Sequence, residues 1–171
     1  MITQRMSEPN QQLMTFIDKC EEKGFLNNKS LKLMKWEWCL ETGGAWFVTY
    51  TDDLKEIISV SGIHPFEDGF RVLFRGAQLA TRPCGLNRYH MQSYCFADQL
   101  PMQIDFAGNN PLYITTNVNH DASGKMNKVN KLFHTLCKLG VVDFVEQKEV
   151  WYQIQNIWKL NVDKYNSVKH Q

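Results

Sequence analysis

The residues best suited to chemistry lie in one short loop, RPCGLN at residues 82–87, between an apolar run and a stretch with helical periodicity. The first amides of a helix have no intrahelical partner, and the helix dipole adds about half a positive charge there. Gly85 allows a ligand to approach the backbone closely, and Arg82 offers a countercharge with a planar fork for phosphate. The sequence therefore predicts an anion site built from Arg82, Gly85 and the amides of Leu86, Asn87 and Arg88.

The position of this loop strengthens that prediction. It follows a predicted strand at residues 71–80 and precedes a predicted helix at about 88–99, and the next predicted strand is residues 112–118. A right-handed crossover makes these two strands parallel neighbours. Ligands of open sheets gather beyond the carboxyl ends of such strands. The alternative is that Pro83 and Gly85 only mark the end of one element and the start of the next.

The first half of the chain predicts two helical segments and three antiparallel strands. Leu13, Phe16 and Ile17 give residues 10–23 an amphipathic helical pattern. Residues 27–44 indicate a short helix running into an extended segment, since apolar residues alternate at Trp36, Trp38 and Leu40. A hairpin turns at residues 51–55, and a second turn at 66–70 is expected to use Gly69 with a positive φ.

The second half predicts a strand at residues 112–118, a helix from Ser123 to Leu139 ended by Gly140, and two closing antiparallel strands. Whether residues 102–107 are helical stays open, and the polar tail after Asn161 is expected to be loosely held. The predicted fold class is α+β, with a single mixed, mostly antiparallel sheet and helices on both faces. We expect one domain over residues 1–171, with its core at about 10–161.

Composition excludes several classes of protein. The 171 residues carry a formal net charge of +1, which gives no support for a nucleic-acid or membrane partner. The five cysteines are widely spaced, without a pattern typical of zinc ligands, so we expect no metal site and reduced thiols. No stretch is typical of a signal peptide or a membrane span. A cytoplasmic protein is the resulting prediction.

Two motifs resemble those of GNAT acetyltransferases, and more narrowly small acetyltransferase-like proteins of bacteriophages. That family carries Q/R-x-x-G-x-G/A after its fourth strand, and residues 82–87 match its basic first position, spacing and middle glycine. They depart from it at Asn87. The family's late helix commonly ends L-Y-x-K-x-G-F, to which Lys138 and Gly140 correspond, while Leu136 stands at the tyrosine position.

The resemblance implies the GNAT fold, acetyl-CoA as acyl donor and an amine as acceptor. It implies that Arg82, Gly85 and Asn87 bind the pyrophosphate and that Asn117 contacts the pantetheine arm between two splayed parallel strands. Backbone amides at the end of the central strand would hold the thioester, at Gln78, Leu79 and Ala80.

Acetyl transfer also needs a group that accepts the amine proton and one that protonates the thiolate. His64 is the candidate base, because imidazole titrates near neutral pH. The alternative for His64 is a strand histidine that is hydrogen-bonded within the fold or faces solvent. Tyr113 is the candidate acid, and its alternative is a packed strand aromatic.

Three functions follow, in order of preference. The first is an N-acyltransferase in which a small-molecule or protein amine attacks the thioester directly. The second is a catalytically inactive GNAT-fold binding protein, for example a phage factor that engages a host protein, which the loss of the tyrosine at Leu136 favours. The third is a nucleic-acid binder using Arg71, Arg75, Arg82 and Arg88. The oligomeric state stays open, a homodimer included.

Overall fold

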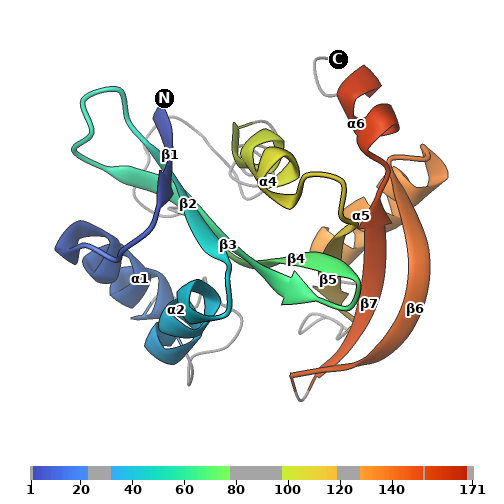
Figure 1. The fold of residues 1–171 in the computed structure, drawn as a ribbon, viewed down its shortest axis with the longest axis horizontal. Helices are drawn as coiled ribbons and strands as arrows, with labels where there is room; N and C mark the ends of the chain where they lie inside the picture. Colours follow the sequence, from blue (N-terminus) through green and yellow to red (C-terminus); the bar gives the residue numbers. More distant parts are fainter. Residues whose placement is uncertain (1, 23–31, 78–97, 119–127, 152, 169–171) are drawn as a thin grey trace. The chain divides into compact units, whose positions relative to one another are not determined.

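The structure is a computed structural model that describes residues 2–22, 32–77, 98–118, 128–151 and 153–168 (Figure 1). The strands are β1 (Ile2–Met6), β2 (Ala45–Tyr50), β3 (Ile57–Phe66), β4 (Gly69–Ala77), β5 (Leu112–Asn117), β6 (Val142–Val150) and β7 (Gln153–Leu160). The helices are α1 (Gln11–Glu22), α2 (Lys32–Glu41), α4 (Leu100–Ala107), α5 (Lys128–Lys138) and α6 (Val162–Val168).

The strands form a seven-stranded mixed sheet in the order β1-β2-β3-β4-β5-β7-β6. β4 and β5 are its parallel pair, as the strand–helix–strand pattern predicts. The α+β fold class is therefore confirmed. The splay of this pair stays a prediction.

Chain contacts divide the protein into two compact units. The first comprises Met1–Pro65 and Val72–Gly108, and the second comprises Phe66–Arg71 and Asn109–Gln171.

The first unit is built on β1, β2 and β3, with α1 and α2 on one face and α4 on the other (Figure 1). All six residues of β2 are buried, as expected for a strand covered on both faces. The rings of Phe47 and Phe106 of α4 meet edge-on, with 6.4 Å between their centroids. The ring centroids of Trp38 of α2 and His64 of β3 are 4.8 Å apart. Leu13, Phe16 and Ile17 are buried, which confirms the apolar face predicted for α1.

The prediction of an extended segment through Trp36, Trp38 and Leu40 is wrong, because α2 continues to Glu41. The hydroxyl of Thr42 donates to the carbonyl of Trp38 at 2.8 Å, and the Gly44 amide donates to the Cys39 carbonyl at 2.6 Å. These contacts cap the last helical turn. A short run with large apolar residues at every second position can be a strand or part of a helix. This pattern therefore does not distinguish the two over residues 36–40.

The second unit contains β5, the hairpin β6–β7 and the helices α5 and α6. β5 and β6 both pair antiparallel with β7, which confirms the two closing strands. On one face, Phe133 of α5 packs against Trp158 of β7 with 5.9 Å between ring centroids. Gly140, with φ 78°, ends the helix as predicted, because a left-handed residue after the last turn strongly favours glycine.

Two short elements and one turn differ from the predictions. β1 was not predicted, and α6 replaces the loosely held tail, anchored by the buried Tyr165. In the turn before β4, Glu67 has the positive φ of 51°, not Gly69. Gly69 is needed for space instead: a β-carbon there would lie 2.0 Å from the carbonyl oxygen of Pro111, which accepts a bond from the Phe70 amide.

Candidate active site

The predicted anion loop cannot be placed in the structure. Gln78, Leu79, Ala80, Arg82, Gly85, Leu86, Asn87 and Arg88 all lie in residues 78–97, outside the described residues. Their roles stay predictions. The described part of the chain contains the other three candidates, His64, Tyr113 and Asn117.

His64 is a buried residue near the end of β3 in the first unit, with 2 % of its surface exposed. Its Nδ1 lies 2.7 Å from the carbonyl oxygen of Pro65. Because a carbonyl can only accept, Nδ1 carries the proton, and in the neutral ring Nε2 holds the basic lone pair. In this tautomer Nε2 is the ring atom that can accept a proton, and it is buried.

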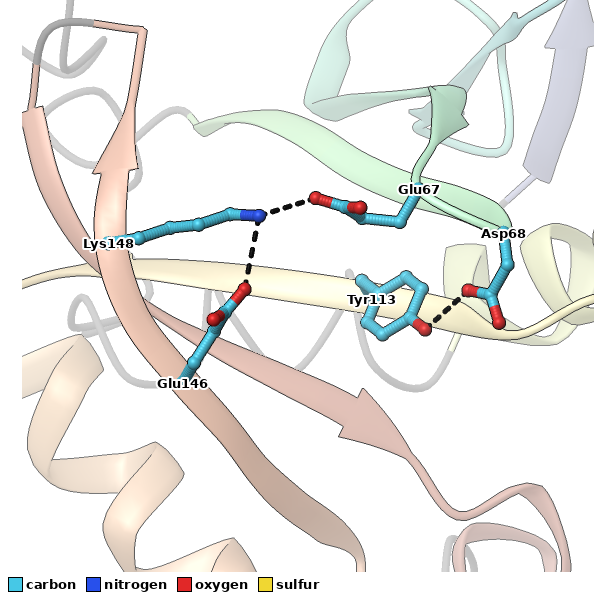
Figure 2. A network of polar contacts seen from close by, with 5 residues as sticks. All are labelled: Glu67, Asp68, Tyr113, Glu146 and Lys148. Carbon is cyan, nitrogen blue, oxygen red and sulfur yellow. Dashed lines mark hydrogen bonds and ion pairs between the residues drawn. The ribbon is translucent and has the colours of Figure 1, made fainter.

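Tyr113 of β5 is 8 % exposed, and its hydroxyl donates to Oδ1 of Asp68 at 2.5 Å (Figure 2). Its ring also meets Phe66 edge-on, with 5.7 Å between centroids. The hydrogen bond to Asp68, burial and the negative charges of Asp68 and Glu67 raise the pKa of Tyr113 to about 12. Tyr113 is therefore a neutral phenol whose proton is directed at a carboxylate.

An ion-pair network lies beside this tyrosine in the second unit (Figure 2). Nζ of Lys148 donates to Oε1 of Glu67 at 2.5 Å and lies 3.1 Å from Oε1 of Glu146. These hydrogen bonds raise the pKa of Lys148, with Glu67 contributing most. Lys148 therefore keeps its charge across the neutral range and is a poor nucleophile.

Asn117, the last residue of β5, is half-buried and already engaged. Its Nδ2 donates to Oε1 of Gln153 at 3.1 Å, across the β5–β7 pair. The Asn117 side chain also carries a carbonyl oxygen, which is a hydrogen-bond acceptor.

A buried polar cluster in the first unit was missed by sequence reasoning. Gln99, 0 % exposed, directly precedes α4. Its Nε2 donates to Thr49 and to Ser59, and its Oε1 accepts from Ser61 at 2.5 Å. Gln103 donates to the same Ser61 hydroxyl at 2.7 Å. This cluster fixes the start of α4 on β2 and β3, where the chain returns from residues 78–97.

Among the described residues, no three or more His, Cys, Asp or Glu side chains are grouped to hold a metal ion. In the same part of the chain, no helix is long and apolar enough to cross a membrane.

Comparison with known proteins gives a consistent result at the level of structure. No family model and no curated protein matches the sequence. The crystal structure of Escherichia coli ElaA superposes with a TM-score of 0.61 at 11 % identity, covering 94 % of this chain and 100 % of ElaA. Aminoglycoside 6'-N-acetyltransferase in complex with coenzyme A gives 0.58 at 12 % identity, covering 93 % and 95 %. A GNAT-family acetyltransferase from Staphylococcus aureus gives 0.52 at 12 % identity, covering 94 % and 99 %.

The chain has the GNAT acetyltransferase fold. The narrower resemblance to bacteriophage proteins stays a prediction. Gly140 follows α5, the helix that the motif resemblance matches to the family's late helix. Leu136, at the tyrosine position, is half-buried. This helix therefore carries no phenol at that position.

The raised pKa of Tyr113 gives this residue a measurable signature. One of the six tyrosines should ionise near pH 12 in an ultraviolet titration, and Tyr113→Phe should remove that step. Since the pKa of Tyr113 is raised on folding, its bond to Asp68 stabilises the fold fully below about pH 10, and this stabilisation is lost as pH rises towards 12. Asp68→Asn should bring the step back towards pH 10. A wild-type titration without a late step would contradict the assignment.

Proposed function

We propose that this protein is an acetyl-CoA-dependent N-acyltransferase that transfers an acetyl group to an amine. The observation that carries the proposal is the GNAT fold over nearly the whole chain, shared with a structure that binds coenzyme A. The loop sequence at residues 82–87 adds local support, since it offers an arginine, a glycine and helix-terminal amides to a diphosphate. A small-molecule or protein amine is the acceptor, and the reaction takes place in the cytoplasm.

The reaction is direct attack by the amine nitrogen on the thioester carbonyl carbon. A carbon–nitrogen bond forms, the carbon–sulfur bond breaks, the amine loses a proton and the thiolate gains one. In this proposal Arg82, Gly85 and the amides of Leu86, Asn87 and Arg88 hold the diphosphate. The amides of Gln78, Leu79 and Ala80 polarise the carbonyl, and Asn117 hydrogen-bonds the pantetheine arm.

His64 is the proposed base and Tyr113 the proposed acid. Proton acceptance at Nε2 of His64 is supported by the Nδ1–H bond to Pro65. Tyr113 is protonated at neutral pH, but its bond to Asp68 makes its proton harder to release than that of a free phenol. The alternative is that the thiolate takes its proton from water. A thiol is a weak acid that titrates above neutral pH, so its thiolate is readily protonated in neutral solution.

A turnover assay tests the proposal. Free thiol is measured after mixing the protein with acetyl-CoA and a panel of primary amines, with protein-free and amine-free samples as controls. The proposal expects thiol release that depends on both protein and amine. Coenzyme A binding by calorimetry without thiol release from any amine would select the inactive binding protein instead.

A further inference from the structure

Two turns of the second unit contain bulky residues with left-handed backbone. Glu67, in the turn between β3 and β4, and Trp151, in the turn between β6 and β7, both have φ of 51°. Residues other than glycine adopt this conformation rarely, and it persists when the surroundings hold it in place. Both turns should therefore be fixed by contacts of their side chains.

Arg71 supplies the contact at Trp151. Its guanidinium carbon lies 5.3 Å from the centroid of the Trp151 ring and 5.7 Å from that of Phe66. Its Nε donates to the hydroxyl of Thr115 at 2.9 Å, and only 4 % of the residue is exposed. A desolvated guanidinium against aromatic rings gives one of the stronger cation–π interactions.

Lys148 supplies the contact at Glu67. Its ammonium joins Glu67 of the β3–β4 turn to Glu146 of β6 (Figure 2). The same ammonium lies 5.8 Å from the centroid of the Phe66 ring. The Phe66 ring therefore lies near both the Arg71 guanidinium and the Lys148 ammonium. The side chains of the ion pair are partly exposed, 37 % for Lys148 and 48 % for Glu67, so salt should screen this contact.

We propose that Arg71 and Lys148 together form a strap that holds the tip of the β6–β7 hairpin, defined here as Lys148–Trp151 and Gln153, against the β3–β4 turn. The tip opens as a local unit when salt weakens the strap. Lys148 is the salt-sensitive half, because its ion pairs face solvent. Arg71 is the salt-resistant half, because its contacts are buried. The hairpin tip thus responds to ionic strength without unfolding of the whole second unit.

Hydrogen exchange of the backbone amides at the tip tests the salt-sensitive half. In wild-type protein, raising sodium chloride from low to molar concentration should speed exchange at the tip about threefold. Lys148→Met should exchange about fivefold faster at low salt and lose the salt response, and Lys148→Arg should restore both. Lys159→Met, which removes an exposed lysine of β7, is the matched control and should behave as wild type.

A second pair of variants tests the salt-resistant half. Arg71→Met keeps the apolar bulk and should speed exchange at the tip by about tenfold or more. If Arg71→Met does not fold, Trp151→Leu removes the ring while leaving Arg71 and Thr115 in place, and should speed exchange about fivefold. Wild-type rates at the tip in Lys148→Met or Trp151→Leu would overturn the proposal, as would an equal increase at every amide of the chain.

Discussion

Gln99→Leu is expected to lower the free energy of unfolding by about 2–4 kcal/mol. The buried amide of Gln99 donates to Thr49 and Ser59, and it accepts from Ser61. A leucine of similar size fills the space but leaves these hydroxyls without their partner in a water-free environment. Buried polar groups that lose their hydrogen bonds destabilise a protein more than the bond itself stabilises it.

Urea unfolding followed by circular dichroism measures this effect. Gln11→Leu is the matched control, because Gln11 is an exposed residue at the start of α1 whose side chain contacts only Thr15 at 3.3 Å among the hydrogen bonds described for it. It should change stability by less than about 0.5 kcal/mol. A Gln99→Leu protein as stable as the control would show that the cluster does not anchor α4.

Arg82→Ala is expected to weaken coenzyme A binding by about 1.5–3 kcal/mol, which corresponds to roughly a tenfold to 150-fold higher dissociation constant. The interaction that we expect this change to remove is a charge-assisted hydrogen bond from the Arg82 guanidinium to a phosphate oxygen of coenzyme A. Isothermal titration calorimetry with coenzyme A gives the constant directly.

Arg5→Ala is the control for that experiment. Arg5 is an exposed arginine of β1 that lies 4.7 Å from the centroid of the Phe106 ring, and the GNAT resemblance assigns it no role with the cofactor. It should leave the dissociation constant unchanged. Equal constants for wild type and Arg82→Ala would remove Arg82 from the site.

Periodicity and turn chemistry were sufficient for most of the fold. Local patterns along the chain predict the apolar face of α1 and the hairpins β2–β3 and β6–β7. The crossover rule predicts the parallel pair β4–β5. The failures have local causes. β1 is a short strand at the edge of the sheet with a mostly exposed pattern, and α6 depends on the burial of one residue, Tyr165, which composition alone does not reveal.

The polar contacts could not be predicted in the same way. Tyr113 and Asp68 are 45 residues apart, and Gln99 and Ser61 are 38 residues apart, so only the fold brings each pair together. The sequence marks Tyr113 as a strand aromatic but carries no sign that its hydroxyl would meet a carboxylate. Residue type alone therefore identifies a candidate group such as Tyr113. Its hydrogen-bond partner and protonation state follow only from the folded structure.

Native mass spectrometry of the purified protein with coenzyme A tests most directly whether residues 82–88 wrap a diphosphate. Wild-type protein should carry one coenzyme A per chain, and Arg82→Ala should lose most of this complex at the same ligand concentration while Arg5→Ala retains it. Wild-type protein that stays ligand-free in excess coenzyme A would contradict the account, and so would a complex that Arg82→Ala forms as fully as wild type.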